Sequence, residues 1–196
     1  MPCPLSRYHQ VPPWPRFYRS RIATRFVSKT STILKLLAIS SQSARMKKRF
    51  VFGSIYADRM QLNVLGEIVK DCLVEIPRHF ANVEIPVHSI MPNHLHSILV
   101  LRERAQRAVP LLTRDEHTEG FGEPVAGSVP TIVRSFKSAV TRRARIALKN
   151  HSLEVWQPNY FERVIRSTDE FRKTWQYFCE NPAKWDFDPE NPQKRQ

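Results

Sequence analysis

The sequence is poor in cysteine and has no long apolar run. It contains three cysteines in 196 residues, Cys3, Cys72 and Cys179, scattered and with no Cys-x-x-Cys pair. This pattern argues against a disulfide scaffold or a zinc ribbon and fits a reducing, cytoplasmic compartment. No apolar stretch approaches the roughly 20 residues that a membrane-spanning helix needs, so we expect no segment that crosses a membrane.

Acidic residues are also scarce relative to basic ones. The chain has 18 Asp and Glu against 31 Lys and Arg, which gives a formal net charge of +13. An excess of this size predicts a polyanionic partner, with nucleic acid as the first expectation and an acidic membrane surface as the second. The length and the 41% hydrophobic content suffice for one domain with its own core plus an extension.

The composition divides the chain into three parts. Residues 1–48 contain no acids and are rich in proline, arginine and serine without a steady period, which predicts an irregular or disordered basic extension. Residues 49–185 carry regular apolar patterns and are expected to form the globular domain. Residues 186–196 are expected to form a polar tail. Met46, near the end of the extension, is a second candidate for the start of the protein.

Apolar periodicity predicts the elements of the globular part. Strand patterns occupy 49–63 (a hairpin), 83–91, 94–101 and 153–165, and helix patterns occupy 63–77, 129–150 and 167–182. Pro86 places its strand at a sheet edge or a bulge, whereas the 94–101 strand is apolar on both faces and is expected to be central. Residues 102–128 are a predicted loop. This order predicts an α+β fold, a ferredoxin-like antiparallel sheet with helices packed on one face.

Two histidines, His94 and His96, lie one residue apart in the predicted central strand, in the run MPNHLHSILV. Side chains two apart in a strand point to the same face, so both imidazoles aim at one point. Paired histidines packed beside a sheet are the plain structural interpretation. Burying two unpartnered imidazoles is costly, however, and two charged ones would repel each other. A shared metal ion removes both costs.

Tyr177 is the candidate nucleophile. On a helical wheel it lies roughly 130° from the middle of the apolar stripe of its helix, whereas a core tyrosine would lie on that stripe. Asn181 follows four residues later on the same helix face. Its amide oxygen offers a third, hard ligand beside the two imidazoles.

The predicted 129–150 helix has a basic face. Six of its residues are candidates for contact with a nucleic-acid backbone: Arg134, Lys137, Arg142, Arg143, Arg145 and Lys149. Most of them gather roughly opposite the apolar stripe of the helix, where they can follow a strand of phosphates. An ordinary solvated surface is the alternative interpretation.

Four blocks of the sequence resemble the REP-associated tyrosine transposases, a branch of the single-tyrosine HUH transposases (histidine, hydrophobe, histidine). In order they are HSIMPNHLHSILVL, VPTIVRSFKSAVTRRAR, VWQPNYFERVIRS and YFCENPAKW. The resemblance covers about residues 49–185. It implies that His94 and His96 are metal ligands and that Tyr177 is the catalytic tyrosine. Asn181 stands where related enzymes carry a glutamine that completes the metal site.

The same resemblance implies an activity and its partners. The tyrosine would attack a phosphate of single-stranded DNA, leaving a 5′-phosphotyrosine and a free 3′-hydroxyl, and would thereby cleave and rejoin hairpin-forming extragenic repeats. The cofactor would be a divalent metal, Mg²⁺ or Mn²⁺, of which Mn²⁺ suits mixed nitrogen and oxygen ligands better. The enzyme would be a monomer or a homodimer in the bacterial cytoplasm, associated with the nucleoid and not with a membrane.

The start of the domain departs from this family. Its members open with an aromatic-rich strand, and KTSTILKLLAISSQSARMK stands in that place here. Either Ile33–Ser40 supply the strand, or it is remodelled or lost. A catalytically degenerate or domesticated nucleic-acid-binding relative is therefore the alternative function.

Two further hypotheses concern the site residues. Tyr160 is the rival nucleophile, although an aromatic side chain in an extended segment usually packs. A zinc-stabilised structural module would need four side chains to converge: Cys72, His88, His94 and His96. Cys72 lies on the apolar stripe of its predicted helix, which argues against that module.

Overall fold

The computed structural model of the protein describes residues 32–40, 51–102 and 127–191. Along the chain its elements are strands β1 (Thr32–Ser40), β2 (Gly53–Tyr56) and β3 (Arg59–Leu62), helix α2 (Val64–His79), strands β4 (Val83–Ile90) and β5 (His94–Arg102), helix α3 (Val129–Ala147), strand β6 (Phe161–Ile165), helix α4 (Thr168–Glu180) and the 3₁₀ helix η1 (Pro182–Phe187). This mixture confirms the predicted α+β class. Within the described ranges, no helix combines the length and the apolar character that crossing a membrane requires.

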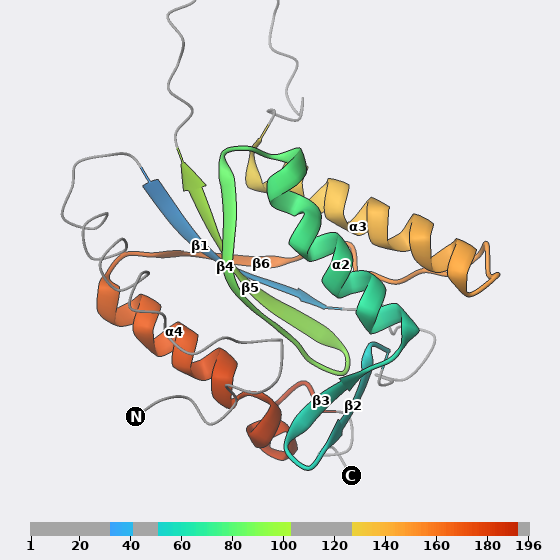
Figure 1. Ribbon diagram of the computed structural model, residues 1–196. Coiled ribbons are helices and arrows are strands. Elements are labelled where there is room, and N and C mark those ends of the chain that lie inside the picture. Colours follow the sequence, from blue (N-terminus) through green and yellow to red (C-terminus); the bar gives the residue numbers. More distant parts are fainter. Residues whose placement is uncertain (1–31, 41–50, 103–126, 192–196) are drawn as a thin grey trace, which may run out of the picture.

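Four strands form one antiparallel sheet in the order β4-β5-β1-β6 (Figure 1). β2 and β3 form a separate hairpin, which turns at Ala57 and Asp58 with φ angles of 48° and 61°. β5 has a partner on each side, as its two apolar faces predict. β4 lies at the sheet edge, and its register shifts between Glu84 and Val87. The expectation for Pro86 is therefore confirmed, because proline cannot donate a hydrogen bond to the ladder.

β1 lies inside the sheet. It pairs with β5 along its whole length and with β6 on its other side. The prediction that residues 1–48 are irregular is therefore wrong for Thr32–Ser40, and Ile33–Ser40 do supply a strand. A short apolar run between polar flanks can be a strand or a buried helix, and only its neighbours in space decide between them. The rest of that extension and the 103–126 part of the predicted loop lie outside the described residues.

Helices cover both faces of the sheet. Leu95 and Leu99 of β5 belong to an apolar cluster that includes residues of α2 and α3. Ile98 and Val100, which alternate with them along the strand, belong to a second cluster with α4. The prediction that the helices pack on one face is therefore wrong, because α4 lies on the opposite side from α2 and α3 (Figure 1). A strand that is apolar on both faces needs a cover on both.

α4 begins with a capping-box arrangement. The hydroxyl of Ser167 accepts a hydrogen bond from the backbone N–H of Glu170 at 3.1 Å, and the Glu170 carboxylate accepts one from the backbone N–H of Arg166 at 2.8 Å. At the other end the backbone stays helical through Asn181, with φ −55° and ψ −46°, and continues into η1. Asn181 therefore keeps its place one turn beyond Tyr177.

Candidate functional site

His94 and His96 lie side by side on the α4 face of β5. Their ring centroids are 4.7 Å apart and their planes meet at 76°. The prediction that both rings point to one side of a central strand is confirmed. Burial lowers the pKa of His94 to about 4; burial and then His94 lower the pKa of His96 to about 3, against an opposing effect of Asp188. Both imidazoles are therefore neutral at neutral pH, which is the form that binds a metal ion.

Tyr177 stands at the rim of this histidine pair. Its ring centroid lies 5.5 Å from that of His96, and 46% of the residue is exposed. Phe178, the next residue of α4, stacks on the His96 ring at 5.6 Å. Burial and the charge of Asp188 raise the pKa of the Tyr177 hydroxyl, whereas the Asn181 side chain lowers it. The phenol is therefore accessible and protonated at neutral pH.

Asn181 completes the set of four residues singled out in the sequence. It is 3% exposed. Its effect on the pKa of Tyr177 shows that the two side chains lie close together. The structure thus gathers His94, His96, Tyr177 and Asn181 in one place, while their chemical roles stay predictions.

Among the described residues, two buried polar atoms in this region have no hydrogen-bond partner: Nδ1 of His96 and Oγ of Ser89. Ser89 lies opposite His96 in the pairing of β4 with β5. An unpartnered buried polar atom costs about 1–3 kcal/mol, so the site has unused binding capacity. Its imidazole nitrogens with amide and hydroxyl oxygens suit Mn²⁺ and, less well, Mg²⁺.

The donor set is short of acidic ligands. Among the described residues, no three His, Cys, Asp or Glu side chains gather at one point. An ion held by His94 and His96 would therefore complete its coordination with oxygens from neutral side chains, water or a bound substrate. Such a site fits a metal that works together with a phosphate-bearing ligand.

The C-terminal segment also contacts the site, which the sequence patterns did not indicate. Nδ1 of His94 lies 2.8 Å from Oδ1 of Asn93, and Nδ2 of Asn93 donates to the carbonyl of Glu190 at 2.7 Å. Asp188 is buried and acts on the pKa of His96. The sequence places Asn93 in a turn and Asp188 in a tail, and neither position signalled a role at the histidines.

Residues 186–191 belong to the folded domain. η1 extends to Phe187, and the backbone N–H and side chain of Asn191 donate to the carbonyls of Asp188 and Trp185 at 3.0 and 3.1 Å. The predicted domain end at residue 185 is therefore too early. Polar composition alone suggested a tail, but these polar groups bond to the backbone of their own segment. The tryptophan at position 185 is the feature of the sequence that indicated a packed segment here.

The rival site residues lie elsewhere. Tyr160 packs against the apolar cluster of α2 and α3, and burial and then Glu162 raise its pKa. Cys72 belongs to that same cluster, on the opposite face of the sheet from His94 and His96. The zinc module is therefore wrong, because its ligands do not converge.

Three of the six basic residues predicted to contact DNA bind the protein itself. Arg143 forms a two-pronged ion pair with Glu75 of α2, with N–O distances of 3.2 and 2.6 Å. Lys137 donates to the successive main-chain carbonyls of residues 157–159, and Arg145 donates to another carbonyl. These contacts hold α3 against the rest of the domain. They also use N–H groups of the three side chains that could otherwise donate to a DNA phosphate.

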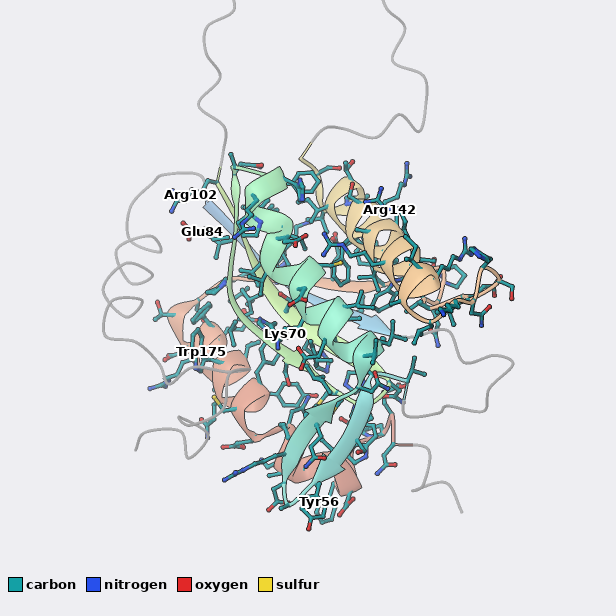
Figure 2. The ribbon with its side chains drawn as sticks, turned by 45° about the vertical axis from the view of Figure 1, so that its right-hand side comes forward. Tyr56, Lys70, Glu84, Arg102, Arg142 and Trp175 are labelled. Atoms are coloured by element: carbon teal, nitrogen blue, oxygen red, sulfur yellow. The ribbon has the colours of Figure 1, made fainter. Side chains whose placement is uncertain are left out.

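The other three basic residues are differently placed. Arg134, Arg142 and Lys149 form no ion pair within the described part of the chain. The predicted helix end at residue 150 is too late, because α3 ends at Ala147 and Lys149 lies beyond it with a φ of 49°. Arg142 lines a shallow depression of about 460 Å³ along α3. Figure 2 shows Arg142 on α3, across the sheet from Trp175 of α4. The basic surface and the histidine pair therefore lie on opposite faces of the sheet.

Comparison with curated proteins finds a relative from Haemophilus influenzae, itself uncharacterised. It is 37% identical over 142 residues, which cover 72% of this chain and 77% of that protein. The chain belongs to the family of this protein. No protein-family profile matches the chain.

Two solved structures resemble the present protein in fold. A REP-associated tyrosine transposase bound to a REP hairpin is 18% identical with a TM-score of 0.49, over 80% of this chain and 70% of that one. A proposed transposase from Deinococcus radiodurans R1 is 18% identical with a TM-score of 0.43, over 79% of this chain and 94% of that one. A likeness at this level concerns the fold alone.

Proposed function

We propose that the protein is a metal-dependent transposase or endonuclease that cleaves and rejoins single-stranded, hairpin-forming repeat DNA through a 5′-phosphotyrosine intermediate. One observation carries the proposal. Two neutral imidazoles, His94 and His96, meet on one face of a strand, and the accessible Tyr177 lies at their rim. A metal-holding group beside an accessible phenol is an arrangement that can transfer a phosphodiester to a tyrosine.

His94, His96 and Asn181 would hold the ion. The two imidazoles offer neutral nitrogens, and the amide of Asn181 offers a hard oxygen. A bound Mn²⁺ or Mg²⁺ supplies charge that polarises the scissile phosphate. Nδ1 of His96, which has no hydrogen-bond partner among the described residues, supports this assignment.

Tyr177 would carry the covalent step. Its oxygen bonds to phosphorus, the bond from phosphorus to the 3′ oxygen of the preceding nucleotide breaks, and that oxygen takes up a proton as the phenol loses one. One phosphodiester replaces another, so the reverse attack by a 3′-hydroxyl rejoins a strand. Because the pKa of Tyr177 is raised, its proton must leave during the attack. Asn181 assists, since it favours the phenolate.

Arg134, Arg142 and Lys149 would contact the phosphates of the hairpin, in keeping with the net charge of +13. They lie across the sheet from Tyr177, so a substrate that contacts both regions passes round a sheet edge. A folded hairpin with a single-stranded flank can do so, because the flank bends freely. The protein would act as a monomer or homodimer on DNA of the nucleoid, in the bacterial cytoplasm.

The sheet order supports a ferredoxin-like core. Among the four strands of the sheet in chain order, the second and third are consecutive neighbours, the first lies beside the third, and the fourth lies beside the first. All neighbours are antiparallel, which is the order that two interleaved βαβ units give. α4 and η1 would then be additions that cover the second face and supply Tyr177 and Asn181.

A covalent adduct tests the proposal. The protein is incubated with hairpin oligonucleotides that carry single-stranded flanks, in the presence of Mn²⁺ or Mg²⁺. We expect a protein–DNA adduct that survives a denaturing gel and does not form after chelation of the metal.

The alternative function is a catalytically degenerate nucleic-acid-binding relative. The observation that favours it is the separation of the basic face of α3 from Tyr177 by the sheet. Hairpin binding without an adduct in either metal would support this alternative and contradict the proposed enzyme.

A further inference from the structure

Asn93 joins the C-terminal segment to His94. Its side chain is 6% exposed, and its two polar atoms have different partners. Nδ2 lies 2.7 Å from the carbonyl oxygen of Glu190, and Oδ1 lies 2.8 Å from Nδ1 of His94. A carbonyl oxygen only accepts, so the amide nitrogen of Asn93 must face Glu190. The amide oxygen must then face the imidazole ring.

This arrangement fixes the tautomer of His94. Because Oδ1 of Asn93 only accepts a hydrogen bond, Nδ1 of the neutral ring must carry the proton. The lone pair therefore lies on Nε2, which is the ring atom left to bind an ion. Histidines that ligate metals commonly have their other nitrogen held in this way by an acceptor outside the coordination shell.

The carbonyl of Glu190 is itself held in place by residues 185–191, which we call the C-terminal clasp. The N–H of Glu190 donates to the carboxylate of Asp188 at 2.8 Å. Asn191 closes the segment with hydrogen bonds to the carbonyls of Asp188 and Trp185. The side chains of Trp185, Asp188 and Asn191 are buried, so the Glu190 carbonyl that accepts from Asn93 has a defined position.

We infer that Asn93 is a positioning residue for His94 and that, through Asn93, the C-terminal clasp is part of the metal site. The inference rests on the proposed function, because it takes His94 as a ligand. Trp185 of the clasp also lies beside His94, with the two ring centroids 6.1 Å apart. His96 differs, since its Nδ1 has no hydrogen-bond partner in the part of the chain that the structure describes. The protein thus fixes the tautomer of one proposed ligand before an ion binds.

The chain offers a matched control in Asn63. Its amide also joins two segments, since Oδ1 accepts from the N–H of Gly66 at 2.9 Å and Nδ2 donates to the carbonyl of Val51 at 2.9 Å. Alanine at either asparagine removes two hydrogen bonds, so both variants should lose stability. Only Asn93→Ala removes the partner of His94.

Two measurements on the full chain test the inference. Nitrogen-15 NMR of the metal-free, histidine-labelled protein reports which nitrogen of His94 carries the proton. Titration calorimetry reports the Kd for Mn²⁺. We expect an Nδ1 proton in wild type and in Asn63→Ala, and its loss in Asn93→Ala. The Kd for Mn²⁺ should rise about 10–100-fold in Asn93→Ala and not in Asn63→Ala.

Three results would overturn the inference. A wild-type His94 with its proton on Nε2 does so without any variant, so the test survives a variant that fails to fold. An Asn93→Ala protein that binds Mn²⁺ as tightly as Asn63→Ala also does so. A wild type that has the Nδ1 proton but binds no Mn²⁺ overturns the metal role of His94 in the proposed function, and the inference with it. The metal-free NMR measurement separates these cases.

Discussion

The ring of Tyr177 lies edge-on to the ring of His96, with the centroids 5.5 Å apart and the planes at 70°. His96 is partly buried and neutral, while Tyr177 is half exposed. The contact exists because α4 packs its Phe178 onto His96 and its Trp175 into the cluster on that face. A candidate nucleophile and a candidate ligand, from distant parts of the chain, are therefore held at a fixed separation by apolar packing.

Tyr177→Phe should abolish the covalent adduct and keep hairpin binding. The change removes the attacking oxygen and preserves the ring, and 46% of the residue is exposed. The free energy of unfolding should therefore change by no more than about 0.5 kcal/mol. Phosphate contacts do not need the hydroxyl, so the Kd for the hairpin should change little. Denaturing gels measure the adduct, urea unfolding measures the stability, and titration with the hairpin measures the Kd. Tyr160→Phe is the control and should keep the adduct; its loss there alone would mean that Tyr160 is the nucleophile.

Arg142→Ala and Arg143→Ala should differ although the residues are neighbours. Arg143 is held by Glu75, whereas Arg142 has no ion pair within the described part of the chain. We expect Arg142→Ala to lower the slope of log Kd against log salt by about one unit for hairpin DNA. Arg143→Ala should leave the slope nearly unchanged. It should lower the free energy of unfolding, because the Glu75 carboxylate loses its ion-pair partner. Equal slopes for wild type and Arg142→Ala would show that this face does not touch DNA.

The buried histidines should make the protein less stable in acid. Burial lowers the pKa of His88 to about 4, as it does for His94, and His96 lies lower still, at about 3. The unfolded chain, with histidines near 6.5, therefore binds protons first as the pH falls. Stability is full above about pH 6.5 and is lost between about 6.5 and 4, by about 1.4 kcal/mol per pH unit for each histidine. Urea unfolding across this range measures the slope.

His88→Leu measures the contribution of one histidine to this pH dependence of stability. His88 lies near Lys70 of α2 rather than beside Tyr177, so the change leaves the proposed metal ligands in place. It also removes a buried nitrogen that has no hydrogen-bond partner. The fall in stability with pH should become shallower by about the contribution of one histidine. A slope equal to that of wild type would mean that His88 is protonated alike in the folded and unfolded states.

Ser89→Ala should not destabilise the metal-free protein. The Ser89 hydroxyl is buried without a hydrogen-bond partner, so removing it relieves a desolvation cost. Ser97 on β5 is the matched control, because its hydroxyl donates to the carbonyl of Val87 at 3.4 Å. Ser97→Ala should lower the free energy of unfolding by about 0.5–1.5 kcal/mol. A loss in Ser89→Ala as large as in Ser97→Ala would show that the Ser89 hydroxyl has a partner.

Local periodicity determined which side chains share a face of one element. Alternation along a strand put His94 and His96 on one side, and the helical repeat put Tyr177 off the apolar stripe with Asn181 one turn away. These predictions hold because the backbone of a single strand or helix fixes the directions of its own side chains.

The tertiary structure decided which elements meet. The sequence could not show that Thr32–Ser40 enter the sheet, since a short apolar run has no partner of its own. Nor could it separate Arg142 from Arg143, because Glu75 lies 68 positions away from its partner. The bond from Asn93 to the backbone spans 97 positions. Contacts of this kind depend on how all apolar surfaces are buried together, which is a property of the whole chain and of no single segment.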